Sequence, residues 1–268
     1  MFFLSSLQKH GVPGTLAAKL RTVAWPYLVW SVVQGLVEIQ LSRLTNGSVV
    51  PADVAALLWQ PRAQFWFLYA LFFISAIALP VYRWLPVRWQ PAVPVLACLA
   101  YLYGNSLPGG IPLVFVIQYA PYFACGVVFG RMANVTVSSR PGWVAAAAVT
   151  LAVVAHSISL GPLGFEPVAR WSHLALAMVC IVAVVACCQW LARWHLHWLA
   201  ALGRASLAIY VMHILAGSGA RIVMQKMMGV DAVAVHLVVG TVAGIVVPLL
   251  ALGLIERLGL RAWLGLGR

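Results

Sequence analysis

The segment LGRASLAIYVMHIL, residues 202–215, places polar side chains in a helix that is apolar enough to cross a membrane. Ser206, Tyr210 and His213 of this segment share one helix face with Gly217, which lies two residues beyond it. The four positions are spaced i, i+4, i+7 and i+11, which is helical spacing. Ionisable side chains inside a membrane tend to be functional, and an imidazole changes its protonation near neutral pH. The sequence therefore predicts His213 as a catalytic acid or base, with Tyr210 and Ser206 beside it. The alternative is that these side chains only join neighbouring helices.

A second polar stripe with the same spacing lies in residues 22–42: Tyr27, Ser31, Gln34 and Glu38. Polar groups that face lipid stay unpaired, which is costly in hydrocarbon. Both stripes are therefore predicted to face other helices or an aqueous cavity. Gln34 and Glu38 are candidate substrate-binding residues, and Glu38 is expected near the outer end of its span.

Aromatic side chains near these stripes are candidates for stacking on a sugar or lining an acyl tunnel. Trp66 and Tyr69 lie in QFWFLYALF, residues 64–72, and Tyr122 lies in VIQYAPYFACG, residues 116–126. The alternative is that they pack between helices or anchor helix ends at the membrane interface.

The other residue types exclude several kinds of chemistry. Five acidic residues in all make paired carboxylates or a bound divalent cation improbable, and we expect no metal site. The five cysteines lie in apolar runs without CxxC or Cys/His spacing, which is typical of packing residues. No G-x-S-x-G, H-E-x-x-H or Walker A motif is present. A histidine general base is the catalytic option that remains.

The elements that must position these residues are predicted to be membrane-spanning helices. Of the 268 residues, 63% are hydrophobic and 8% are charged, whereas soluble domains carry about 25% charged residues. Apolar runs approach the length that crosses a bilayer, and they predict eight spans, near 22–42, 64–83, 91–104, 111–130, 141–160, 171–192, 205–224 and 232–255. We predict an all-α integral membrane protein, a polytopic helix bundle forming one domain over residues 1–268.

The basic residues predict the orientation of this bundle. The net charge is +12, but Lys and Arg stand singly between apolar runs, which disfavours nucleic acid as a partner and fits membrane lipid. Twelve of the seventeen fall at the termini and in the even-numbered loops. The positive-inside rule therefore places both termini in the cytoplasm.

Four segments follow one another in a recognisable order: KLRTVAWPYLVWS (19–31), FWFLYALF (65–72), YAPYFACGVVFGR (119–131) and LGRASLAIYVMHIL (202–215). Together they resemble the acyltransferase-3 family of membrane O-acyltransferases, and within it the fucose 4-O-acetylase-like branch. The resemblance covers essentially the whole chain. It implies a bundle of about ten helices of membrane-spanning length. It also implies transfer of an acyl group, often acetyl, from cytoplasmic acyl-CoA to a sugar hydroxyl of a surface polysaccharide or its lipid-linked precursor.

On this resemblance the donor is acyl-CoA, most simply acetyl-CoA, and no cofactor is tightly bound. The acceptor is a carbohydrate, and the location is the inner membrane of a bacterium. Three basic residues at the predicted cytoplasmic mouth are candidates for holding the CoA phosphates: Lys19, Arg21 and Arg204. The alternative for these three is anchoring by the positive-inside rule.

The chain departs from the family pattern at its start. Family members have a first span with a basic residue and a histidine that is the leading candidate for the catalytic base. Here the sequence begins with MFFLSS, which is similar to the middle of the family's second span. We therefore expect an N-terminally incomplete relative that shows low or no acyl transfer by itself.

Two other functions stay open. A transporter or flippase for a lipid-linked glycan would use the same stripes as a polar path, although the sequence shows no internal repeat. A catalytically inactive relative would serve as a membrane partner in glycan assembly.

Overall fold

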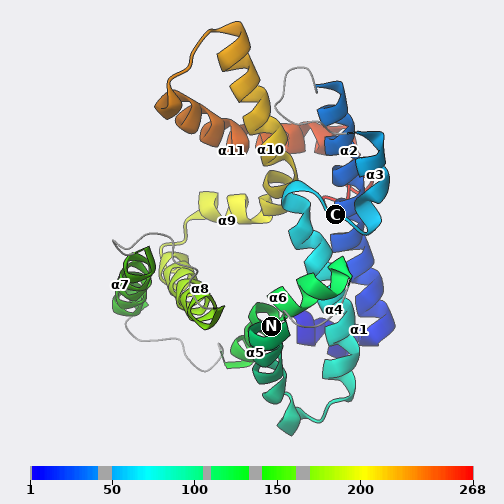
Figure 1. Ribbon diagram of the computed structural model, residues 1–268, viewed down its shortest axis with the longest axis vertical. Helices are drawn as coiled ribbons and strands as arrows, with labels where there is room; N and C mark the ends of the chain where they lie inside the picture. The colour runs from blue at the N-terminus through cyan, green and yellow to red at the C-terminus, as the bar shows by residue number, and fades with distance from the viewer. Residues whose placement is uncertain (1, 42–49, 105–109, 133–140, 161–169, 268) are drawn as a thin grey trace. The chain divides into compact units, whose positions relative to one another are not determined.

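The computed structural model describes residues 2–41, 50–104, 110–132, 141–160 and 170–267. Every regular element in these ranges is helical (Figure 1), which confirms the predicted all-α class. The chain divides into two compact units. Unit 1 comprises Met1–Lys9 and Val81–Trp198, and unit 2 comprises His10–Pro80 and Leu199–Arg268.

Unit 2 holds most of the polar residues singled out in the sequence. Its first stretch contains the end of α1 (Phe2–Lys19), the π-helical turn η1 (Leu20–Ala24), α2 (Trp25–Gln40), α3 (Pro51–Ala55), the short turns η2 (Ala56–Leu58) and η3 (Ala63–Phe65), and most of α4 (Trp66–Trp84). Its second stretch contains the end of α9 (His197–Arg204), α10 (Ser206–Ile222), the π-helical turn η6 (Val223–Met227) and α11 (Val233–Arg257).

Glycines let α10 and α11 pack closely as an antiparallel pair. A Cβ added to Gly217 would lie 3.7 Å from the carbonyl oxygen of Gly240, and one added to Gly244 would lie 3.7 Å from His213. Gly240 and Gly244 are spaced by four residues, the pattern that allows helix backbones to approach in a membrane.

Unit 1 contains the start of α1, the end of α4, η4 (Val87–Trp89), α5 (Ala92–Tyr103), α6 (Ile111–Met132), α7 (Pro141–Leu160) and α8 (Arg170–Ala192). Within it, α5 packs with α6 and α7 packs with α8 (Figure 1). Arg170 joins α8 to α5, because its Nη1 donates to the carbonyl oxygen of Tyr101 at 2.7 Å. Its guanidinium also lies 5.4 Å from the centre of the Tyr101 ring.

Local sequence signals account for how several helices begin or bend. Pro26 and Pro51 stand in the first turns of α2 and α3, where a missing N–H costs nothing. Asp53 accepts a hydrogen bond from the N–H of Val50 at 2.9 Å and caps α3. Gly11 adopts a φ of 64° and interrupts α1, a conformation that favours glycine.

All eight predicted spans are helical, but they differ in length. Five helices of the described chain are long and apolar enough to cross a membrane: Pro51–Trp84, Ile111–Gly130, Arg170–Ala192, Ser206–Met227 and Val233–Arg257. Two predicted spans correspond to shorter helices, α2 with 16 residues and α5 with 12. The described apolar part of the 141–160 span is Gly142–Ser157. The helix α2 continues without a break from η1, so its 16 residues are not the full length of the helical segment, and the predicted count of about eight spans stays a prediction.

Candidate functional site

The polar stripe of α2 faces the interior of unit 2, as the sequence predicts. Ser31 and Gln34 each keep 3% of their surface exposed, and Tyr27 is buried with them. Val32 and Leu36, on other faces of the helix, are exposed. This is the reverse of a water-soluble helix, and it suits a helix whose apolar side meets lipid.

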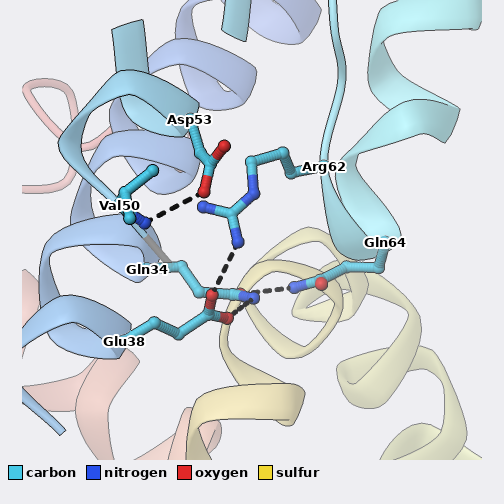
Figure 2. Close-up of polar contacts among 6 residues, drawn as sticks. All are labelled: Gln34, Glu38, Val50, Asp53, Arg62 and Gln64. Carbon is cyan, nitrogen blue, oxygen red and sulfur yellow. Dashed lines mark hydrogen bonds and ion pairs between the residues drawn. The ribbon is translucent and has the colours of Figure 1, made fainter. Parts of the chain in front are cut away.

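Glu38, Gln34 and Gln64 form a hydrogen-bonded chain from α2 to the start of α4 (Figure 2). The Nε2 of Gln34 donates to Oε1 of Glu38 at 2.8 Å, and the Nε2 of Gln64 donates to Oε1 of Gln34 at 2.8 Å. An ionised carboxylate can only accept hydrogen bonds, so Glu38 fixes the direction of both amides. The chain therefore ends on Oε1 of Gln64, which is buried and has no hydrogen-bond partner among the described residues.

Arg62 adds a positive charge to these residues, and the four side chains of Gln34, Glu38, Arg62 and Gln64 are called the polar cluster below. Its Nη2 lies 3.1 Å from Oε2 of Glu38, and the two side chains are 26% and 28% exposed. Figure 2 shows the guanidinium directed toward the carboxylate of Glu38, while the carboxylate of Asp53 accepts from the N–H of Val50. Partial exposure screens the ion pair, so its main effect is to hold the segment before α4 against the end of α2.

Two tyrosines hold the turn that precedes Arg62. The hydroxyl of Tyr27 donates to the carbonyl oxygen of Leu57, and that of Tyr69 donates to the carbonyl oxygen of Leu58 at 3.1 Å. The two rings are 5.5 Å apart. Both hydroxyls therefore hold backbone, and the predicted contact of Tyr69 with a sugar stays a prediction.

Tyr210 connects α10 to this cluster. Its hydroxyl donates to the main-chain carbonyl oxygen of Gln64, so the first turn of α10 lies beside the start of α4. With both termini in the cytoplasm, the predicted spans 64–83 and 205–224 begin on opposite sides of the membrane. The contact shows that these two helix starts do not both lie at a membrane surface.

His213 lies about one turn after Tyr210 on α10, and the local backbone holds its ring. The Nδ1 lies 2.8 Å from the carbonyl oxygen of Tyr210. A carbonyl only accepts, so Nδ1 carries the proton and Nε2 is the free lone-pair nitrogen of the neutral ring. No residue in the described ranges forms a hydrogen bond with Nε2. A neutral imidazole in this form can accept a proton from a bound hydroxyl.

Other predicted residues lie away from the buried cluster. Ser206 is exposed at the first residue of α10, and Arg204 is exposed at the last residue of α9. The residues that α10 buries are Ala208, Val211 and Met212, and the predicted role of Ser206 beside His213 stays a prediction.

Lys19 and Arg21 lie on the helical segment just before α2. Burial disfavours the ammonium form and lowers the pKa of Lys19 from its ordinary value of 10.5. Arg21 is exposed, and its Nε donates to the carbonyl oxygen of Ala17 at 3.4 Å.

The two remaining aromatic candidates belong to different units. Trp66 opens α4 in unit 2 and is partly buried, with its ring centre 6.1 Å from that of Phe67. Tyr122 lies on α6 in unit 1, with its ring centre 6.5 Å from that of Tyr119.

Sequence reasoning missed the way the C-terminal segment is held. The indole N–H groups of Trp25 and Trp30 donate to the carbonyl oxygens of Trp263 and Leu264, at 2.8 and 2.9 Å. Gly265 packs on the start of α2 with a φ of 68°, in a space too tight for a side chain. The start of α2 and the C-terminus therefore lie on the same side, which agrees with the predicted orientation of both ends.

Sequence reasoning also missed Arg62 as the ion-pair partner of Glu38. A weak signal was visible, since an arginine and an acidic residue, one of only five in the sequence, lie within 25 residues of each other at 38–62. Among the described residues, no group of three His, Cys, Asp or Glu side chains could hold a metal ion.

Comparison with protein families gives one assignment. The acyltransferase-3 family model, described as an acyltransferase domain, matches residues 1–253. Searches of curated proteins and of solved structures gave no match.

Proposed function

Because the chain belongs to the acyltransferase-3 family and is a multi-pass membrane acyltransferase, we propose that it moves an acyl group from acyl-CoA to a sugar hydroxyl of a cell-envelope carbohydrate. The observation that carries this proposal is the hydrogen bond that orients the ring of His213. Its Nδ1 is occupied by the Tyr210 carbonyl, which leaves Nε2 unpaired as a base.

The proposed chemistry uses this nitrogen twice. The Nε2 of His213 removes the proton of the sugar hydroxyl while the oxygen attacks the thioester carbonyl. The tetrahedral intermediate collapses and the C–S bond breaks. The imidazolium then returns the proton to the departing sulfur, which gives the sugar ester and free CoA. Tyr210 has a positioning role, because its hydroxyl is occupied by Gln64 and its carbonyl fixes the His213 tautomer.

We assign the donor and the location from the family and the charge pattern. Lys19, Arg21 and Arg204 are the proposed partners of the CoA phosphates, since basic side chains bind phosphate well. Acetyl is the proposed acyl group, and the inner membrane of a bacterium is the proposed location. Gln34 and Glu38 are proposed to face the carbohydrate, beside Trp66 and Tyr69.

The test uses the purified protein in nanodiscs with acetyl-CoA labelled on the acetyl carbon and a bacterial envelope polysaccharide as acceptor. The departure from the family pattern at the start of the sequence predicts that transfer is slow, but we expect label to enter the polysaccharide as an alkali-labile ester, with one free CoA thiol released per ester. We expect His213→Ala to lower this rate by about 10²–10⁴-fold, the usual contribution of a general base.

His156→Ala is the matched control, because His156 is exposed on α7 of unit 1. It is expected to keep the wild-type rate. Equal rates for the two alanine variants would remove His213 from the mechanism. Wild-type protein that transfers no label and does not bind a non-hydrolysable acetyl-CoA analogue would refute the proposed function.

A further inference from the structure

Two of the buried polar atoms of unit 2 that have no hydrogen-bond partner among the described residues lie beside Gln34: Oγ of Ser31 and Oε1 of Gln64. Ser31 lies one turn before Gln34 on the same face of α2, and Gln64 donates to Gln34. Both unpaired atoms therefore flank Gln34. Buried polar atoms in proteins are nearly always paired, so each such atom calls for an explanation, such as an absent ligand.

The direction of the amide chain shows what the ligand must offer. Rotating the Gln64 amide would place its oxygen against Oε1 of Gln34, and two acceptor atoms cannot form a hydrogen bond. Gln34 cannot rotate to compensate, because its Nε2 donates to Glu38. The free atom at Gln64 is thus an acceptor and requires a donor. The hydroxyl of Ser31 can both donate and accept. An alcohol group is donor and acceptor at once, so it can pair with either atom.

The charges near these atoms indicate whether the ligand group is neutral or charged. The positive charge of Arg62 is already paired with Glu38, so it is not free to bind an anion. A phosphate or ionised carboxylate group would also bring its own acceptor oxygens against Oε1 of Gln64, which needs a donor. A neutral hydroxyl group can donate to this oxygen without adding a charge.

We propose that Gln64 and Ser31 form a subsite for a hydroxyl of an uncharged sugar, oriented by Glu38 through Gln34. This inference rests on the proposed function, because it names the part of unit 2 that binds the carbohydrate acceptor.

Direct binding tests this subsite without any turnover. Equilibrium dialysis of the protein in nanodiscs would use tritiated methyl glycosides of glucose, galactose, mannose and fucose as probes. The wild type is expected to bind at least one of them. Ser31→Ala should weaken that binding about tenfold, which corresponds to about 1.4 kcal/mol. Because nothing in the described ranges pairs with the Ser31 hydroxyl, its removal should leave the melting temperature unchanged or raise it.

Ser75→Ala is the matched control. Its Oγ is also buried and unpaired, but it lies on α4 about 16 Å along the helix from Gln64 and has apolar neighbours. It should show the same stability and wild-type affinity. Gln64→Leu should weaken binding at least as much as Ser31→Ala, whereas Gln40→Leu, on an exposed residue of α2, should not.

Each outcome decides the proposal. Binding that Ser31→Ala and Gln64→Leu leave unchanged would overturn the subsite and leave the acyl-transfer proposal intact. A wild type that binds none of the four glycosides would overturn the carbohydrate assignment of these atoms. Label transfer from acetyl-CoA, measured separately, reports on the proposed function itself.

Discussion

Gly35 allows α2 and α3 to approach closely enough to form the polar cluster. A Cβ added at this position would lie 2.8 Å from Cγ2 of Val54 and 3.8 Å from Nη1 of Arg62. Carbon atoms in contact normally lie about 3.5–4.0 Å apart. Gly35→Ala therefore requires α3 to move away from α2 by about 1 Å, and the loop that carries Arg62 must move with it.

The magnitude follows from two opposing terms. Inserting a methyl group into a packed contact costs about 1–3 kcal/mol. Alanine recovers about 0.5–1 kcal/mol, because glycine is the weaker helix former. The expected net destabilisation is about 1–2 kcal/mol, which corresponds to a fall in melting temperature of about 2–4 °C per kcal/mol for a protein of this size.

The assay is thermal unfolding in nanodiscs, followed by the near-ultraviolet signal of the tryptophans. Gly240→Ala is the matched control, because a Cβ there meets nothing within 4 Å, and it should be neutral or stabilising. Val54→Ala removes the atom that clashes, so Gly35→Ala should cost little in that background, with a coupling of about 0.5–3 kcal/mol. If Gly35→Ala is as stable as Gly240→Ala, the close approach described here is wrong.

Two further predictions concern the start of α2 and the segment before it. Trp30→Phe should lower the free energy of unfolding by about 1–3 kcal/mol, because it leaves the carbonyl of Leu264 unpaired. The same variant should speed tryptic cleavage at Arg261. Trp25→Phe should have smaller effects on both, since Trp25 is 44% exposed and Trp30 is 6% exposed. Lys19→Met should raise the melting temperature at neutral pH. The lowered pKa of Lys19 means that its charged form opposes folding below that pKa. The gain should shrink as the pH rises through the lowered pKa toward 10.5, the ordinary value of lysine, and a gain that does not vary with pH would contradict the burial of this amine.

Periodicity was a sound guide to which residues share a helix face. It predicted that Tyr27, Ser31 and Gln34 turn inward together, and they do. For α10 it did not identify the buried residues, which are Ala208, Val211 and Met212. Apolar composition also located the long helices, since five of the eight predicted spans lie in described helices that are long and apolar enough to cross a membrane.

By itself, the sequence determined that this protein lies in a membrane, that it is helical and to which family it belongs. These properties follow from composition, local spacing and motif order. Only the tertiary structure decided which side chains meet. Arg62 pairs with Glu38 across 24 residues, and Tyr210 reaches Gln64 across 146. A helical period relates positions a few residues apart, so it says which face is polar but not which partner that face will meet. Oε1 of Gln64 is left unpaired because Nε2 of Gln64 donates to Gln34, which in turn donates to Glu38.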